Sequence, residues 1–242
     1  MILAAHQPGY LPWLGYLDKL ARCDVFMIVD DVQYEAQNYQ NRNRVKINNG
    51  VTWLTVPLLG GSRDDRICDK RIPPQSNSKE DWQRRTWRTL QIHYGSAPHF
   101  NDYADELRDV YTRQWNTLVD LDLHMLQLFM RWLGITKPVI RSSSMEIKLQ
   151  KTARIAELCR RVGATRYLSG SGGSRGYLDI ERLNSAGIDV QWQSFNHPVY
   201  PQRYPHLGFV PNLGAIDLLL NCGPGSRDIL LGQSEQALSA AI

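Results

Sequence analysis

The fold is decided by residues 1–31, which read MILAAHQPGYLPWLGYLDKLARCDVFMIVDD. A short apolar run at residues 2–5 predicts a strand ended by the turn at Pro8 and Gly9, and residues 13–23 then carry apolar side chains at helical spacing. A second apolar run, at residues 25–29, ends in two aspartates. Strand, helix and strand in this order predict a βαβ unit, whose parallel strands have their carboxyl ends at one edge of the sheet.

The rest of the chain continues the α/β pattern around a helical stretch. Residues 45–47 and 51–56 predict a β-hairpin, because the intervening Asn-Asn-Gly favours a tight turn. Residues 78–134 have helical periodicity and predict two antiparallel helices preceded by a less regular one. Alternation then resumes, with helices predicted at 152–162, 179–186 and 213–220 and strands at 166–169 and 188–192.

These elements predict a single α/β domain over residues 1–242. Its sheet is expected to be mixed or mostly parallel, flanked by helices and Rossmann-like, with a helical insert at about 78–134.

The composition is ordinary for a packed globular protein, with 43% hydrophobic and 21% charged residues. A net charge of +4 is too small to indicate a nucleic-acid partner, but it suits a small anionic ligand. The four cysteines are far apart, so we expect reduced thiols rather than a disulfide framework. Neither a membrane span nor a signal peptide is apparent, and a cytoplasmic location is expected.

His6 and Gln7 stand at the carboxyl end of the first predicted strand, where open α/β sheets bind ligands. The turn that follows is rich in proline and aromatic residues, including Tyr10 and Trp13, and so keeps little conformational freedom. We predict that Gln7, Tyr10 and Trp13 contact the substrate. The alternative is that His6 caps the strand and the two aromatic side chains belong to the core.

Asp30 and Asp31 end the neighbouring strand and are expected within reach of His6. A carboxylate bonded to one imidazole nitrogen fixes the tautomer and leaves the other nitrogen as a base. We therefore predict His6, Asp30 and Asp31 as catalytic residues.

Residues 37–46 form an amide-rich segment with cations at alternate positions. Because side chains on a strand alternate between faces, Arg42, Arg44 and Lys46 are expected on one face, able to grip a diphosphate. Asn41 and Asn43 are predicted to bind substrate together with the two arginines. The alternative is an edge strand whose charges prevent aggregation.

Residues 167–174 follow a predicted strand and precede a helix. The backbone N–H groups of such a loop bind anions or a developing oxyanion, and we predict Ser169, Gly170 and Gly172 as substrate-binding. A plain flexible loop is the alternative. The segment lacks the spacing of nucleotide-binding glycine motifs, so no Rossmann dinucleotide is predicted.

A second strand end carries a similar set of side chains, and we predict His197, Tyr200 and Gln202 as substrate-binding. No pair of histidines has the spacing of a zinc site, so no metal is predicted. We expect His6, Asp30 or Asp31, Arg42, the loop at 169–173 and Gln202 to line one concave pocket.

Together these segments resemble the WbqC-like family of bacterial O-antigen and other surface-polysaccharide gene clusters. The matching segments are residues 6–16, which read HQPGYLPWLGY, and residues 30–33, 41–43, 53–57, 167–170 and 200–202. The resemblance implies a role in lipopolysaccharide biosynthesis. It implies no catalytic residues.

Such pathways decorate amino sugars on a nucleotide carrier, which makes group transfer the leading hypothesis: a transferase that places an acyl or aminoacyl group on a sugar nucleotide. The expected partners are this small anionic substrate and an acyl donor or carrier protein. A second hypothesis is a nucleotidylyltransferase-like or synthetase-like enzyme, although the HxGH motif of those enzymes is not present. A third is a sugar-nucleotide binding protein without catalytic activity.

Overall fold

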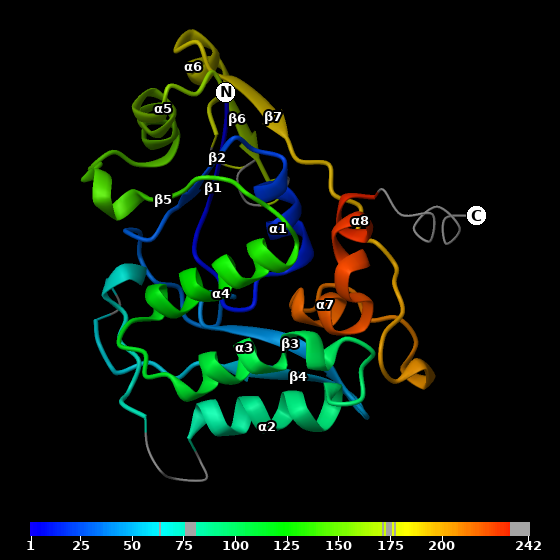
Figure 1. The fold of residues 1–242 in the computed structure, drawn as a ribbon. Helices are drawn as coiled ribbons and strands as arrows, with labels where there is room; N and C mark the ends of the chain where they lie inside the picture. The colour runs from blue at the N-terminus through cyan, green and yellow to red at the C-terminus, as the bar shows by residue number, and fades with distance from the viewer. Residues whose placement is uncertain (63, 76–80, 171, 173–175, 177, 233–242) are drawn as a thin grey trace. The chain divides into compact units, whose positions relative to one another are not determined.

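Residues 1–31 form the predicted βαβ unit, with strand β1 (Ile2–His6), helix α1 (Leu14–Ala21) and strand β2 (Val25–Ile28) parallel to β1. The computed structural model describes residues 1–62, 64–75, 81–170, 172, 176 and 178–232 (Figure 1). The chain forms two compact units. Unit 1 comprises Met1–Pro8, Gly15–Val32 and Thr136–Asn196, and unit 2 comprises Gly9–Leu14, Gln33–Ile135 and the chain from His197.

The sheet of unit 1 has five parallel strands in the order β5-β2-β1-β6-β7. The later strands are β5 (Val139–Arg141), β6 (Arg166–Ser169) and β7 (Asp189–Trp192). The strand order reverses at β1, because β2 and β5 extend the sheet on one side and β6 and β7 on the other. The predicted mostly parallel sheet is confirmed, and the carboxyl ends of all five strands lie at one edge.

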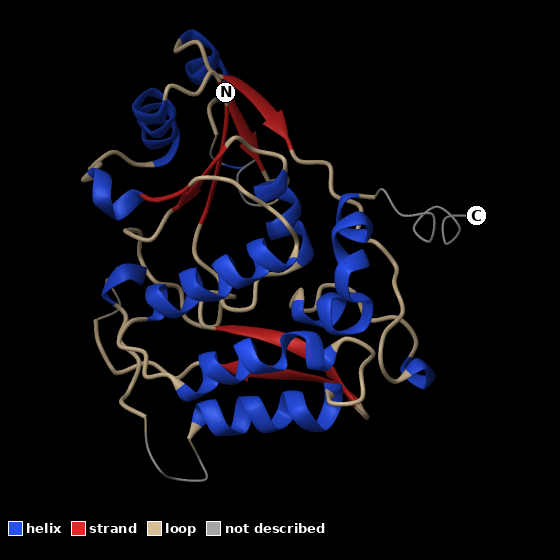
Figure 2. Ribbon diagram, in the orientation of Figure 1, coloured by secondary structure: helices blue, strands red, loops and turns tan. Residues whose placement is uncertain are grey.

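Helices cover both faces of this sheet (Figure 2). Helices α5 (Lys151–Val162) and α6 (Ile180–Ser185) contribute to a buried apolar cluster on one face, with Leu158 and Leu183 packed among Leu3, Met27 and Tyr167. On the other face, Tyr16 of α1 packs edge-on against Phe26, with 5.2 Å between ring centroids. Because side chains alternate along each strand, the sheet packs apolar residues against helices on both of its faces.

Unit 2 contains the predicted hairpin, formed by β3 (Arg42–Ile47) and β4 (Gly50–Thr55) as a separate two-stranded antiparallel sheet. Gly50 adopts a positive φ of 140°, which explains the glycine in the turn. The predicted insert consists of α2 (Trp82–Tyr94), α3 (Phe100–Thr112) and α4 (Leu118–Trp132), and the unit ends with α7 (Ile216–Cys222) and α8 (Ser226–Leu231).

Short 3-10 turns complete the fold at η1 (Ile67–Asp69), η2 (Ser142–Met145), η4 (Pro205–Leu207) and η5 (Gly223–Gly225). None of the helices in the described ranges combines the length and the apolar character that crossing a bilayer requires. The expected single domain and the Rossmann-like relationship stay predictions.

Candidate functional site

His6 ends β1 at the point where the strand order of the sheet reverses. Ser169 ends β6, the strand on the far side of the reversal, so the two residues follow neighbouring strands. In open parallel sheets ligands bind outside the carboxyl ends of the strands at such a switch point. The topology of unit 1 alone, whatever the side chains, thus favours a ligand site at the carboxyl ends of β1 and β6.

The imidazole of His6 is held by its own chain. Nδ1 lies 2.9 Å from the carbonyl oxygen of Gln7, and since a carbonyl only accepts, Nδ1 carries the proton. Nε2 is then an unprotonated acceptor, and no residue in the described part of the chain bonds to it. The ring lies 4.5 Å from that of Tyr16. The sequence predicted a carboxylate as the partner of His6, whereas the structure has the Gln7 carbonyl.

His6 is in contact with solvent at its surface, yet the protein atoms packed around its ring desolvate the charged form of the imidazole. Desolvation by the surrounding protein and the positive charge of Lys19 lower the pKa of His6 from 6.5 to about 4. The residue itself is exposed. His6 is therefore a neutral imidazole at physiological pH, in the tautomer that a general base needs.

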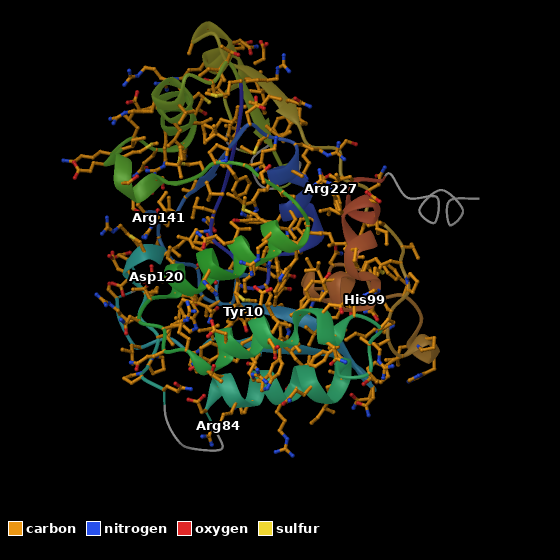
Figure 3. All side chains as sticks on the ribbon, in the orientation of Figure 1. Tyr10, Arg84, His99, Asp120, Arg141 and Arg227 are labelled. Atoms are coloured by element: carbon orange, nitrogen blue, oxygen red, sulfur yellow. The ribbon has the colours of Figure 1, made fainter. Side chains whose placement is uncertain are left out.

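Asp30 and Asp31 bind groups near the carboxyl end of β5 and on α5. Asp30 accepts from Arg141, labelled in Figure 3, at 2.7 Å and from the backbone and hydroxyl of Ser143 at 3.0 and 2.8 Å. Asp31 accepts from Arg154 and from Ser142. Burial alone would raise the pKa of Asp31, but these hydrogen bonds outweigh it and lower the pKa. Both carboxylates therefore fix the loop after β5, and a catalytic role for them stays a prediction.

Lys19 of α1 is a functional candidate that the sequence reasoning missed. Its ammonium donates to the carbonyl of Ala5 at 2.8 Å, directly before His6, and only 4% of the residue is exposed. A Cβ atom built on Gly170 would lie 4.0 Å from its Nζ. A lysine in an amphipathic helix is usually predicted to face water, so no sequence signal marks it.

The predicted loop after β6 is described only in part. Ser169 is buried and its hydroxyl lies 3.4 Å from the carbonyl oxygen of Gly170, while Gly172 is exposed. Ser171 and Gly173 lie outside the described residues. The predicted anion-binding role of this loop stays a prediction.

In unit 2, Arg42 and Arg44 lie around one tryptophan of the hairpin. Arg44 pairs in register with Trp53, and the guanidinium carbons of Arg42 and Arg44 lie 4.3 and 5.8 Å from the Trp53 ring centroid. Arg42 donates to the carbonyl of Gln37 and Arg44 to that of Asn212 at 3.2 Å. No carboxylate in the described ranges forms an ion pair with either arginine. Their positive charge is therefore available to an anion.

A groove of about 340 Å³ lies beside Trp53, between β4 and α2. Its walls are formed by Trp53, Leu54, Thr55, Arg85, Thr86, Arg88, Thr89 and Ile92. Arg85 and Arg88 lie one helical turn apart on α2, so the groove adds two cations to those around the tryptophan.

Tyr10, Asn41 and Asn43 are buried and bonded within unit 2. Asn41 donates to the Val56 carbonyl at 2.8 Å, and Asn43 donates to that of Leu11 at 2.6 Å. Leu11 has a positive φ of 47°, an unfavourable conformation for leucine that the bond from Asn43 helps to hold. The hydroxyl of Tyr10, labelled in Figure 3, lies 2.8 Å from that of Tyr111. These side chains shape the segment after His6, and a direct contact with substrate stays a prediction.

Lys46, Tyr200 and Gln202 belong to a buried polar network around Asp217. Tyr94, Tyr200 and Gln202 donate to the Asp217 carboxylate at 2.6, 3.0 and 3.0 Å. Lys46, the third cation of the predicted diphosphate grip, donates to the Gly208 carbonyl at 2.6 Å and to Gln202 at 3.3 Å. The network joins the hairpin to residues 200–217, so the bonds of the Lys46 ammonium stabilise the fold of unit 2.

His197 and Trp13 also have structural partners in unit 2. Nδ1 of His197 lies 2.9 Å from the Pro198 carbonyl, and Nε2 accepts from the backbone N–H of Asn212 at 3.1 Å. Trp13 is half-buried and forms a backbone bridge with Gly214. Unlike His6, His197 has both ring nitrogens occupied. The expected single pocket draws on residues of both units and stays a prediction.

Comparison with known proteins identifies relatives along most of the chain. The model of the WbqC-like protein family matches residues 7–229. The uncharacterized protein Rv1507c of Mycobacterium tuberculosis is 35% identical over 232 residues, which span 94% of this chain and 96% of that protein. No solved structure matches the chain.

Proposed function

The chain belongs to the WbqC-like protein family, and from this we propose that it transfers an acyl or aminoacyl group to an activated amino sugar during synthesis of a bacterial surface polysaccharide such as O-antigen. The observation that carries the proposal is the imidazole of His6, whose Nε2 is unprotonated and unoccupied by any described residue at the carboxyl edge of a parallel sheet. The other support comes from the cations around Trp53.

The proposed reaction needs a base that removes one proton. The sugar amine attacks the carbonyl carbon of the donor, the C–N bond forms, and the amine proton passes to Nε2 of His6. As the tetrahedral intermediate collapses, the bond from the acyl carbon to the donor breaks and the proton passes from His6 to the leaving group. The low pKa of His6 favours this second transfer, because a weakly basic imidazole releases its proton readily.

Unit 2 by itself offers a candidate position for a diphosphate group, around Trp53. Arg42 and Arg44 offer planar guanidinium groups suited to bidentate phosphate contacts. Trp53 is 42% exposed and supplies an aromatic surface for a sugar or base, and the groove beside it has a volume typical of small-molecule sites. Stacking on Trp53 orders Arg42 before a ligand arrives.

A second candidate function is nucleotidyl transfer, as in nucleotidylyltransferase-like or synthetase-like enzymes. The reversal of strand order between β1 and β6 supports it, since nucleotides bind at such switch points in parallel sheets. The reaction would release pyrophosphate from a nucleoside triphosphate, which group transfer does not do.

The test is a transfer assay after a binding screen. A panel of amino-sugar nucleotides is expected to include one that raises the melting temperature, because a ligand that binds only the native state stabilises it. With that acceptor and a panel of acyl and aminoacyl donors, mass spectrometry should detect the acylated sugar. Pyrophosphate release without acylation would instead support the second function.

Arg42→Ala should lower the affinity for the acceptor at least tenfold and leave the free energy of unfolding within about 1 kcal/mol of wild type, the size of one exposed cation–π contact. Arg108→Ala is the matched control, an exposed arginine on α3 paired with Asp105. Equal binding by Arg42→Ala and wild type would remove Arg42 from the site.

A further inference from the structure

Lys19 places a buried ammonium at the junction of β1 and β6. It reaches from α1 to the carboxyl end of β1, where its single described acceptor is the Ala5 carbonyl at 2.8 Å. An ammonium has three N–H donors, so two remain without a described partner. With 4% of the residue exposed, water satisfies them poorly.

No negative charge balances this ammonium within the described ranges. No carboxylate in the described part of the chain forms an ion pair with Lys19. The two titratable side chains that interact with it, His6 and Cys23, are both neutral at physiological pH, because burial lowers the pKa of His6 to about 4 and raises that of Cys23 to about 11. Burial lowers the pKa of Lys19 to about 8, as expected for an ammonium without a counter-ion. A buried and unpaired charge of this kind is costly to the fold, which calls for an explanation.

The polar groups on either side of Lys19 satisfy one another. Toward β5, Arg141 and Arg154 neutralise Asp30 and Asp31. Toward β7, Gln193 donates to the carbonyl of Gly15 at 2.8 Å and to the carboxylate of Asp18 at 2.7 Å. The described polar groups of both networks therefore have partners, whereas the Lys19 ammonium has no opposite charge among the described residues.

We propose that Lys19 and the backbone at Gly170 form an anion site, with Nε2 of His6 beside it, that binds a phosphate group of a substrate. A lysine acts as a point charge toward phosphate, and the backbone at Gly170 is close enough to contact the same anion, since a Cβ atom built on Gly170 would lie 4.0 Å from Nζ. The proposal rests on the proposed function for its substrate class: the phosphate belongs either to the nucleotide of the acceptor or to a coenzyme A donor.

Binding is measured by titration calorimetry with UDP, dTDP, GDP and CDP in one arm and coenzyme A in the other, with inorganic phosphate as reference. Wild type should bind a member of one arm, which identifies the source of the phosphate. Lys19→Met should bind that probe at least tenfold more weakly, while Lys148→Met, which removes an exposed lysine of the same unit, should bind it like wild type. Equal affinity of Lys19→Met and wild type, or no binding of any probe by wild type, would overturn the proposal.

The stability of the unliganded variant separates binding from folding. Methionine has a similar length and no charge, so Lys19→Met should melt at or above the wild-type temperature if the ammonium is kept for a ligand. A marked fall would indicate that the bond to Ala5 is structural and would count against the proposal. A crystal structure of wild type with the bound probe gives an independent answer, because a phosphate oxygen must lie within hydrogen-bonding distance of Nζ. These results do not depend on turnover, so a failed transfer assay would refute the proposed function alone.

Discussion

At the scale of the residue, the neutral state of His6 makes the stability of the protein depend on pH. Because its pKa is lowered from 6.5 to about 4, the unfolded chain binds this proton more tightly than the native protein does. The free energy of unfolding should therefore fall as the pH falls from 6.5 to 4, and this contribution is fully present above pH 6.5. Urea denaturation of wild type and His6→Gln across that range measures it.

As the pH falls from 6.5 to 4, the free energy of unfolding of wild type should fall relative to that of His6→Gln. His99→Gln is a suitable control, since His99 contacts the exposed Asp102 and directly precedes α3 in unit 2. Parallel pH profiles for wild type and His6→Gln would mean that His6 is protonated in the native protein as easily as in the unfolded chain.

Single residues also mark the limit of sequence reasoning. His6 was predicted because a histidine after a strand and before a proline-rich turn is an unusual pattern, but its partner is a backbone carbonyl that no side-chain pattern encodes. Lys19 was missed because its burial depends on how α1 packs against the sheet. The asparagines at 41 and 43 both bond to backbone carbonyls, which the sequence pattern did not indicate, and their contact with substrate stays a prediction.

At the scale of the element, the sequence predicted best where several local signals agree. Helix α5 ends at Gly163 with a positive φ of 71°, as expected from a glycine after the last helical turn, and β6 was predicted with its observed bounds. Strand β5 was missed because three half-buried residues give no periodicity. Helix α8 was missed because it is short and follows Gly-Pro-Gly, which predicts a chain reversal.

The network around Asp217 connects elements that are far apart in the sequence, and its loss should be severe. Burial raises the pKa of Asp217, yet three hydrogen-bond donors surround its carboxylate. Asp217→Ala would leave those buried donors unsatisfied and should lower the free energy of unfolding by about 3 kcal/mol or more. Urea denaturation measures this, with Asp228→Ala at an exposed position of α8 as control. A loss below about 1 kcal/mol would mean that water replaces the carboxylate.

At the scale of the whole molecule, each compact unit is assembled from three separate stretches of the chain. Neither unit is a continuous stretch of sequence, so neither can fold completely before distant parts of the chain have come together. We therefore expect a single cooperative transition in calorimetry, with equal calorimetric and van't Hoff enthalpies. Two resolved transitions would contradict the prediction of one domain.

His6 is proposed to act as the base of a group-transfer reaction, and the His6→Ala variant tests this claim. The variant should keep the melting-temperature increase caused by the acceptor sugar nucleotide, because removal of a base affects the transition state and leaves ground-state binding in place. Its rate of acyl transfer should fall by about 100-fold or more, the usual contribution of general base catalysis. A variant that binds the acceptor and transfers the acyl group at the wild-type rate would contradict the claim, and one that fails to fold would make His6 a structural residue.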